Sequence, residues 1–218
     1  DRSNIATALD AGEVYYELKG FVPKGFADVE AGKDFREVGG DLVHTDKDAA
    51  KKLMEAAGYN ENNKLSLEYY YNQSALHDTV AAVLKQELAD IYVDLKLKTG
   101  EVRTFFDDRD NGLFQMARHA MSADYMDPTT YLDMPMGRNQ AAYRSWGDET
   151  YDKLCDEATT LSGAERIAKL HEAEKYLVEE MSYCIPLIQY DQVSLCLPSV
   201  KGWYTSPQGN FCFWYVTK

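Results

Sequence analysis

The segment from residue 114 to residue 132, FQMARHAMSADYMDPTTYL, predicts a strand that turns almost directly into a helix. Residues 114 to 121 favour a strand, and this pattern breaks off at Ser122. Asp127 is a suitable N-cap and Pro128 a suitable first helical residue, so a helix is expected to begin there. The residues between the two elements therefore lie on a strand-to-helix corner.

Side chains of opposite charge surround this corner. Arg118 and His119 precede it on the predicted strand, and Asp124 and Tyr125 lie on the corner itself. In open α/β folds, ligands tend to bind at the carboxyl edge of the sheet. Cations and a carboxylate at neighbouring points of that edge suit a zwitterionic ligand. The alternative is a solvated loop aspartate beside two surface cations, and the spacing alone leaves that alternative open.

The elements that must position these residues alternate between strand and helix. Alternating, β-forming residues predict strands and apolar residues at helical spacing predict helices. The expected order is strand 65–72, helix 75–91, strand 93–99, helix 102–112 and strand 114–121. Such an order implies a parallel or mixed sheet with right-handed crossovers.

Further helices and a second sheet are predicted outside this region. The expected helices are 3–9, 45–58 with Thr45 and Asp48 at its start, 148–161, and 164–181 with a capping box of Ser162 and Glu165. A short strand is expected at 184–190. Residues 192–197 and 211–216 flank a connection that contains glycine and proline, and they predict two strands of a different sheet.

Charge and hydropathy argue against several classes of protein. The chain has 23 basic and 36 acidic residues, and its net charge of -13 works against binding to nucleic acid or to anionic membranes. It has no apolar run long enough to span a bilayer and no amino-terminal signal region. Because the first residue is Asp1 and not Met, we expect a processed product or an excised segment, so the missing signal says nothing about location.

The cysteines do not predict a metal site. Cys155, Cys184, Cys196 and Cys212 form no CxxC pair and have no histidine at metal-ligand spacing. Cys196 and Cys212 flank the glycine- and proline-rich connection and can face each other across two strands. Burial of the cysteines as free thiols is the interpretation that we favour. The redox state of the compartment is left open.

The sequence shows no pattern that predicts catalysis. An enzyme needs a nucleophile with a base, paired carboxylates in a pocket, or a metal cluster, and none of these is visible. The four histidines are dispersed, and the carboxylates at 107, 108 and 110 lack the ligand spacing of a calcium loop. We therefore expect a protein that is not an enzyme and has no cofactor. A hydrolase with an unfamiliar site is the alternative.

Four segments occur in an order and spacing that resemble a known family. They are YNQSALHD (71–78), FFDDRDNGLFQMARHAMSADYMDP (105–128), RNQAAYRSWGDETYDKL (138–154) and IPLIQY (185–190). Together they resemble the second lobe of the oligopeptide- and dipeptide-binding proteins of ABC importers, over nearly the whole chain. The resemblance implies an α/β fold: a mixed-sheet lobe of a type II periplasmic-binding-protein fold, with helices on both faces.

The same resemblance assigns roles to individual residues. Asp124 matches the acidic residue that pairs with the free α-amino group of a peptide, while Arg118 and His77 match residues that receive its carboxylate at different peptide lengths. Ala120 and Ser122 match the strand whose backbone pairs with the extended peptide.

Three further positions match the ligand cavity of the family. They are Asn72, Tyr190 and Met121, the last at a place where the family often carries tryptophan. Loss of that aromatic wall leaves the shape of the side-chain pocket open.

The resemblance also implies a place in the cell and a set of partners. We expect an extracytoplasmic protein, periplasmic or a cell-surface lipoprotein, that captures peptides for the membrane permease of an ABC importer. Contact with the membrane would come only through a lipid anchor or the transporter. Residues 1–190 would form the second lobe, and residues 191–218 would return to the first lobe.

Other functions stay open at this point. The same fold family binds nickel complexes, haem, glutathione and oligosaccharides, so another solute is an alternative. A purely structural or adhesive domain is a further alternative.

Overall fold

A computed structural model describes residues 1–9, 14–29, 32–139, 147–191, 193–206 and 209–218. Its helices are α1 (Arg2–Ala8), α2 (Phe35–Gly39), α3 (Lys47–Ala56), α4 (Ala75–Ala89), α5 (Val102–Asp110), α6 (Thr129–Leu132), the 3-10 turn η1 (Gly137–Asn139), α8 (Glu149–Thr160), α9 (Gly163–Lys175) and its π-helical continuation η2 (Tyr176–Glu180). Its strands are β1 (Tyr15–Glu17), β2 (Leu65–Asn72), β3 (Val93–Gly100), β4 (Met116–Ala117), β5 (Ile188–Tyr190), β6 (Tyr204–Thr205) and β7 (Phe211–Cys212).

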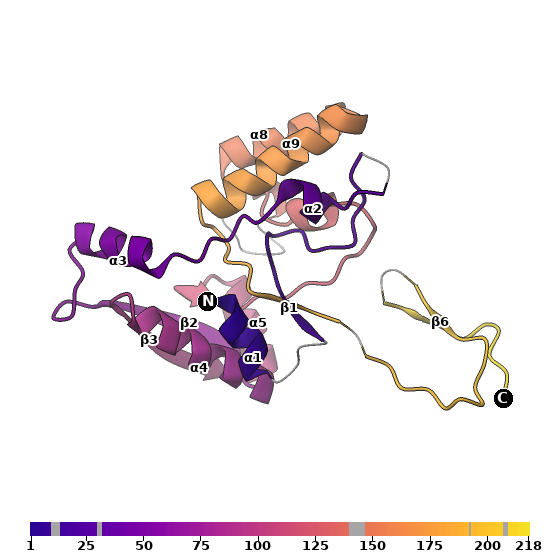
Figure 1. The fold of residues 1–218 in the computed structure, drawn as a ribbon, viewed down its shortest axis with the longest axis horizontal. Helices are drawn as coiled ribbons and strands as arrows, with labels where there is room; N and C mark the ends of the chain where they lie inside the picture. The colour runs from indigo at the N-terminus through magenta and orange to yellow at the C-terminus, as the bar shows by residue number, and fades with distance from the viewer. Residues whose placement is uncertain (10–13, 30–31, 140–146, 192, 207–208) are drawn as a thin grey trace.

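The central sheet has the strand order β3-β2-β4, and both of its pairings are parallel. The chain runs from β2 through α4 to β3, then through α5 to β4, as the alternation of patterns predicts (Figure 1). Parallel pairing places the carboxyl ends of the three strands, at Asn72, Gly100 and Ala117, along one edge. This is the edge at which the sequence predicts a ligand site.

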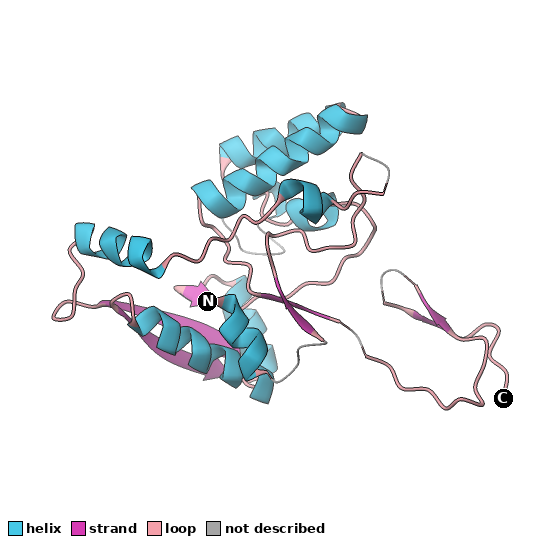
Figure 2. Cartoon of the chain, viewed as in Figure 1, coloured by secondary structure: helices cyan, strands magenta, loops and turns pink. Residues whose placement is uncertain are grey.

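Helices cover both faces of this sheet, and three consecutive tyrosines of β2 show why. Neighbouring residues of a strand point to opposite faces. Tyr69 and Tyr71 pack with Ala81 of α4, whereas Tyr70 turns to the other face and meets Phe105 of α5 at a ring separation of 5.1 Å. The predicted α/β fold with helices on both faces is confirmed (Figure 2).

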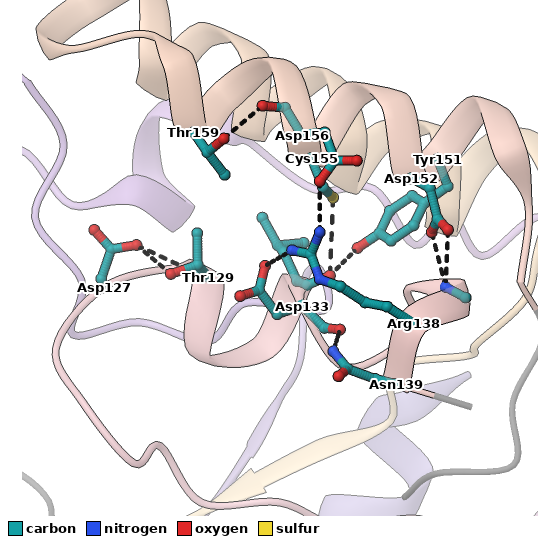
Figure 3. Close-up of polar contacts among 12 residues, drawn as sticks. Asp127, Thr129, Asp133, Arg138, Asn139, Tyr151, Asp152, Cys155, Asp156 and Thr159 are labelled. Atoms are coloured by element: carbon teal, nitrogen blue, oxygen red, sulfur yellow. Dashed lines mark hydrogen bonds and ion pairs between the residues drawn. The ribbon is translucent and has the colours of Figure 1, made fainter. Parts of the chain in front are cut away.

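A helical layer, with α8 packed along α9, forms the other part of the core (Figure 1). Figure 3 shows how α6 and η1 are attached to α8. The Tyr151 hydroxyl donates to the carbonyl oxygen of Leu132 at 2.6 Å, and the Asp152 carboxylate accepts from the N–H of Gly137. Arg138 forms ion pairs with Asp133 and Asp156. These contacts fix the helix that follows the strand-to-helix corner.

A buried ion pair joins α2 to α9. Arg36 and Glu174 are 2% and 0% exposed, and Arg36 Nη1 lies 2.5 Å from Glu174 Oε1. The same carboxylate oxygen accepts from the backbone N–H of Val22 at 2.8 Å. A Cβ at position 20 would overlap the guanidinium, so any residue larger than Gly20 would displace the Arg36 side chain from this pair. The pair therefore closes the loop over the helical layer.

Several local predictions are corrected by the structure. The strand predicted over 114–121 is limited to Met116–Ala117, since only these residues pair with β2. The helix predicted from Thr45 has Asp46 as its N-cap, whose carboxylate accepts from the N–H of Ala49. Ser162 is at the N-cap position of α9, but its side chain makes no capping hydrogen bond.

The carboxyl-terminal segment also differs from its prediction. The described residues of 192–197 form no strand, and β7 pairs instead with β6. This segment extends away from the rest of the molecule (Figure 1). Leu195 and Trp214 are 98% and 88% exposed. The part of the third matching segment that covers residues 140–146 lies outside the described residues.

All four cysteines are free, as predicted, but they are not all buried. Cys155 is buried, Cys184 and Cys212 are half-buried, and Cys196 is exposed. Burial raises the pKa values of Cys155 and Cys184 to about 12, so both are protonated thiols at neutral pH.

Candidate functional site

Asn72, His77 and Arg118, which we call the Asn72 cluster, meet at the carboxyl edge of the sheet. Asn72 is the last residue of β2, and His77 lies in the first turn of α4. Arg118 directly follows β4, and its backbone N–H donates to the carbonyl oxygen of Tyr70 at 2.9 Å. That bond continues the β2–β4 pairing by one residue and fixes the position of the arginine. The structure thus brings together three of the residues predicted from sequence.

Asn72 contacts the other two members through different oxygens. Its side-chain Oδ1 accepts from Arg118 Nη1 at 3.0 Å, and its backbone oxygen lies 2.8 Å from His77 Nδ1. Asn72 is 9% exposed, while His77 and Arg118 are half-buried. The Ser74 hydroxyl caps α4 by accepting from the N–H of His77 at 3.2 Å. The cluster is therefore held by a strand end and by a helix cap.

Burial shifts the pKa values of both basic members of this cluster. Desolvation lowers the pKa of Arg118, although the phenols of Tyr190 and Tyr69 oppose that change, and the arginine remains charged. Desolvation also lowers the pKa of His77 below its usual value, an effect to which the Arg118 charge adds. The bond to the Asn72 carbonyl and the charge of Asp78 act in the opposite direction. At neutral pH the cluster carries one positive charge, on Arg118.

His119 is not the second cation that the sequence predicts. Desolvation, followed by the charges of Arg109 and Arg118, lowers its pKa to about 4. Arg109 Nη1 lies 3.4 Å from His119 Nδ1, and a guanidinium can only donate. His119 is therefore neutral at pH 7 and accepts from Arg109. Arg109, on α5, is a neighbour of the site that the sequence reasoning missed. Its positive charge alone does not show that α5 places it beside His119.

Tyr190 lies at the end of β5, opposite Tyr15 of β1. The two strands pair antiparallel, and the two rings are 6.2 Å apart. Tyr190 is 56% exposed, so most of its ring is open to a ligand or another chain segment. Its phenol lies near enough to Arg118 to influence the arginine electrostatically. This places Tyr190 beside the Asn72 cluster.

Asp124 occupies a separate position, on the corner before α6. Its carboxylate is exposed, and its backbone N–H donates to the Thr130 hydroxyl at 3.0 Å. The negative charge of Asp124 contributes to the raised pKa of the Tyr131 phenol, after the larger effect of burial. The contacts described for Asp124 are thus with α6 and not with the Asn72 cluster.

Asp127 holds this corner in place. Its carboxylate accepts from the N–H and the hydroxyl of Thr129, and it forms two hydrogen bonds with Arg166 of α9, at 2.7 and 2.9 Å. The helix begins at Thr129 with Pro128 as its N-cap, so both predicted positions are shifted by one residue, but the Asp127 carboxylate still accepts from the first N–H of the helix.

The segment from Ala120 to Ala123 joins the cluster to the corner. Within the described part of the chain it makes no backbone–backbone hydrogen bond. Met121 and Ala123 pack against the helical core, whereas Ala120 and Ser122 are exposed. This period of two is the pattern of an extended backbone with one face turned outward. The N–H and C=O groups that lack a partner among the described residues can pair with another extended chain.

Met121 is therefore partly buried, and its buried side packs against the helical core. It packs against the cluster that contains Phe26, Phe35 and Tyr131, as Phe21 also does. The sequence places Met121 in the ligand cavity, and nothing in its contacts tests that role.

Two general observations concern the described residues. No three histidine, cysteine or acidic side chains gather there as a metal site would require. In the same part of the chain, no helix is both long enough and apolar enough to cross a membrane.

Comparison with known proteins decides the family. Residues 1–143 match the model of the bacterial extracellular solute-binding proteins, family 5, middle region. The chain belongs to this family. It is 34% identical over 220 residues to the dipeptide-binding protein DppE of Bacillus subtilis, and the match covers 95% of this chain and 40% of DppE.

Other relatives and solved structures agree with this family assignment. The chain is 31% identical over 156 residues to the periplasmic oligopeptide-binding protein OppA of Escherichia coli, which covers 71% of this chain and 28% of OppA. It is 27% identical over 154 residues, or 70% of the chain and 29% of the relative, to YgiS of Escherichia coli, described as a probable deoxycholate-binding periplasmic protein. The structure of the Escherichia coli murein tripeptide-binding protein MppA matches with a TM-score of 0.77 and 26% identity, over 96% of this chain and 40% of MppA.

These comparisons confirm a type II periplasmic-binding-protein fold, and the family consists of solute-binding proteins. The chain spans about 40% of the length of DppE and MppA.

Proposed function

We propose that this chain is the ligand-binding lobe of an extracytoplasmic protein that captures peptides for an ABC importer. The observation that carries the proposal is the order of groups along one segment. The charged Arg118 stands at one end, an open extended backbone follows, and the exposed Asp124 carboxylate stands at the other end. A peptide in its extended form carries the complementary groups in the same kind of order.

Each part of this segment has a role that its chemistry supports. Arg118 can grip a carboxylate with two parallel hydrogen bonds, although one of its nitrogens is already bonded to Asn72. The open backbone of residues 120–123 can pair with a peptide main chain, which supplies affinity without reading side chains. Asp124 can neutralise the α-amino group. Tyr190 supplies an exposed aromatic surface beside the carboxylate end.

The division of the chain belongs to the same proposal. Residues 1–190 would form the second lobe, and residues 191–218 would return to the first lobe. The exposed apolar side chains of this segment, among them Leu195 and Trp214, support that assignment because such residues usually pack against something. The ligand would then lie between two lobes that close by a hinge motion.

The cellular setting follows from the family. We propose an extracytoplasmic location, periplasmic or as a cell-surface lipoprotein, and a membrane permease as the partner. The proposed role is capture without chemical change, so no enzyme activity and no cofactor are part of it.

The direct test is calorimetry on the complete protein with matched peptides of two to five residues. Each peptide is offered with free ends, with an acetylated amino terminus and with an amidated carboxyl terminus. The proposal expects tight binding of the free form and clear weakening by each modification. If none of the peptides binds, or if both modifications are without effect, the proposed function is wrong.

A second candidate is a carboxylate-bearing solute other than a peptide. The relative YgiS is described as a deoxycholate-binding protein, and deoxycholate has a carboxylate but no ammonium group. Arg118 could receive such a ligand, and Asp124 would have no partner in it. Binding of deoxycholate that depends on Arg118 and not on Asp124 would support this candidate over the peptide.

A further inference from the structure

The hydrogen bond between His77 and Asn72 determines which nitrogen of the imidazole carries the proton. His77 Nδ1 lies 2.8 Å from the backbone oxygen of Asn72. A carbonyl oxygen can only accept a hydrogen bond, so Nδ1 must be the donor. In the neutral ring the lone pair then resides on Nε2.

His77 Nε2 is open to solvent. Nε2 makes no hydrogen bond to any described residue. If it were buried, it would therefore be a buried polar atom without a partner, and it is not one of these. Since His77 is only half-buried, Nε2 is accessible. The atom that a ligand meets is therefore Nε2.

The charged groups around His77 come from two elements in the described structure. Arg118, which follows β4, disfavours a second positive charge, and Asp78, the next residue of α4, favours one. Asp78 also interacts with the Tyr71 hydroxyl of β2, so it does not serve His77 alone. Together with burial, these groups keep the pKa of His77 below its usual value, and the ring is neutral at pH 7.

We propose that His77 offers the ligand a hydrogen-bond acceptor at neutral pH and becomes a carboxylate receptor only when acid protonates Nε2. This inference rests on the proposed function as a peptide-binding lobe and concerns one end of the same site. At neutral pH the occupant of Nε2 is an N–H donor of the peptide, such as a backbone amide or a terminal carboxamide. A carboxylate there would face a lone pair and be repelled.

The role of Asn72 follows from the same geometry. Its backbone oxygen fixes the tautomer of His77, and its side chain holds Arg118. Any residue at position 72 has a backbone carbonyl, so Asn72→Ala would release Arg118 while leaving the contact with His77. Asn72 is thus a positioning residue whose two functions can be separated by one substitution.

The tautomer can be measured directly in the ligand-free complete protein. Nitrogen-15 NMR of labelled histidine distinguishes a protonated ring nitrogen from one with a lone pair, and His77→Gln identifies the signals. We expect a protonated Nδ1 and an unprotonated Nε2 at about pH 7.5. Protonation of Nε2 at that pH would overturn the inference, whether or not peptides bind.

The ligand test compares a peptide carboxylate with its carboxamide at about pH 7.5 and at the lower pH at which the NMR signals show Nε2 to be protonated; the carboxylate stays ionised above about pH 4. For the peptide length whose end reaches His77, acid should shift the preference toward the carboxylate by about tenfold. His77→Gln should abolish this shift. His44→Gln, at a histidine whose side chain is 70% exposed, is the control and should keep it.

The outcomes separate the two proposals. Peptide binding without a pH-dependent preference at any length, or with a preference that survives His77→Gln, contradicts the inference and leaves peptide capture intact. Failure of every peptide to bind contradicts the proposed function, while the NMR measurement still decides the tautomer.

Discussion

Asp127 and Arg166 form an ion pair with two hydrogen bonds, at 2.7 and 2.9 Å, between the corner after β4 and α9. They are 39 positions apart in the sequence. The same carboxylate caps α6, so one residue anchors the corner that carries Asp124. The position of the proposed amino-terminal anchor thus depends on a contact with the helical layer.

We expect Arg166→Gln to lower the free energy of unfolding by about 1–2 kcal/mol at neutral pH, because both partners are partly exposed. Burial alone would raise the pKa of Asp127, but hydrogen bonds from Arg166 and Thr129 outweigh it and lower that pKa. A carboxyl with a lowered folded-state pKa stabilises above its unfolded pKa, and this contribution disappears as pH falls through the folded value.

Urea unfolding of wild type and Arg166→Gln at neutral and strongly acidic pH checks this prediction. The difference between the two proteins should shrink in acid. Lys153→Gln, which removes an exposed ion pair at 3.9 Å, is the control and should cost less than about 0.5 kcal/mol. An equal difference at both pH values would contradict the role of the Asp127 charge.

The buried pair of Arg36 and Glu174 predicts a larger effect. Arg36→Met leaves the Glu174 carboxylate in a site that is 0% exposed, where the N–H of Val22 is its remaining hydrogen-bond donor among the described residues. We expect a loss of about 3–5 kcal/mol in the free energy of unfolding. Lys24→Met, which breaks a solvent-exposed pair with Glu37, is the matched control. A loss below about 1 kcal/mol for Arg36→Met would mean that the carboxyl is uncharged in the folded protein.

A double-mutant cycle between protein and ligand tests whether Asp124 binds the ammonium group of the peptide. If Asp124 pairs with the ammonium group in a site from which water is excluded, Asp124→Asn should weaken binding by about 3–5 kcal/mol. Acetylation of the peptide should cost a similar amount, and the two losses should not add. Calorimetry on the complete protein gives all four corners of the cycle. Additive losses, or losses below about 1 kcal/mol, would identify Asp124 as a solvated loop residue.

Arg118→Lys tests whether geometry or charge matters at the carboxylate end. Lysine keeps the charge but lacks the planar fork that can serve Asn72 and a ligand together. We expect binding of free-carboxylate peptides to weaken by about tenfold or more, with little change for amidated peptides. Calorimetric titration with both peptide forms measures this. Equal weakening of both forms would indicate a general disturbance of the site.

The carboxyl-terminal segment predicts self-association of the 218-residue chain. Leu195 and Trp214 are almost fully exposed, and an apolar patch without cover favours contacts between molecules. Leu195→Ser with Trp214→Ser should lower the apparent mass at high concentration in analytical ultracentrifugation. A chain that is monomeric before the substitutions would show that the segment has another partner within the molecule.

Sequence reasoning succeeded where a pattern reflects local packing. The alternation in β2 and the helical spacing in α4 have this property, because Tyr69, Tyr71 and Ala81 must meet in one core. It failed where length depends on a partner. Residues 114–121 have strand-forming side chains, but β4 is limited to the two residues that pair with Tyr69 and Tyr70.

The same distinction between local patterns and distant contacts applies to the site. The charge pattern around the corner predicted Arg118, the resemblance to the family predicted His77, and the structure places both beside Asn72. The bond between Arg118 and Asn72 joins residues 46 positions apart, and no local pattern contains such a bond. The neutral state of His119 depends first on burial and then on the charges of Arg109, which α5 supplies, and Arg118. A histidine in a sequence therefore predicts a cation only where the groups around it in the fold do not lower its pKa.

The pairing of β1 with β5 has a consequence for engineering. Tyr15 faces Tyr190, and the N–H of Leu18 donates to the carbonyl oxygen of Leu187 at 3.1 Å, so the chain leaves and returns at one place. A module whose ends meet can be inserted into a surface loop of another protein without long linkers. The segment 15–190 offers one attachment point of this kind, but it is complete only with α1, because Arg2 and Ile5 of that helix are buried against it.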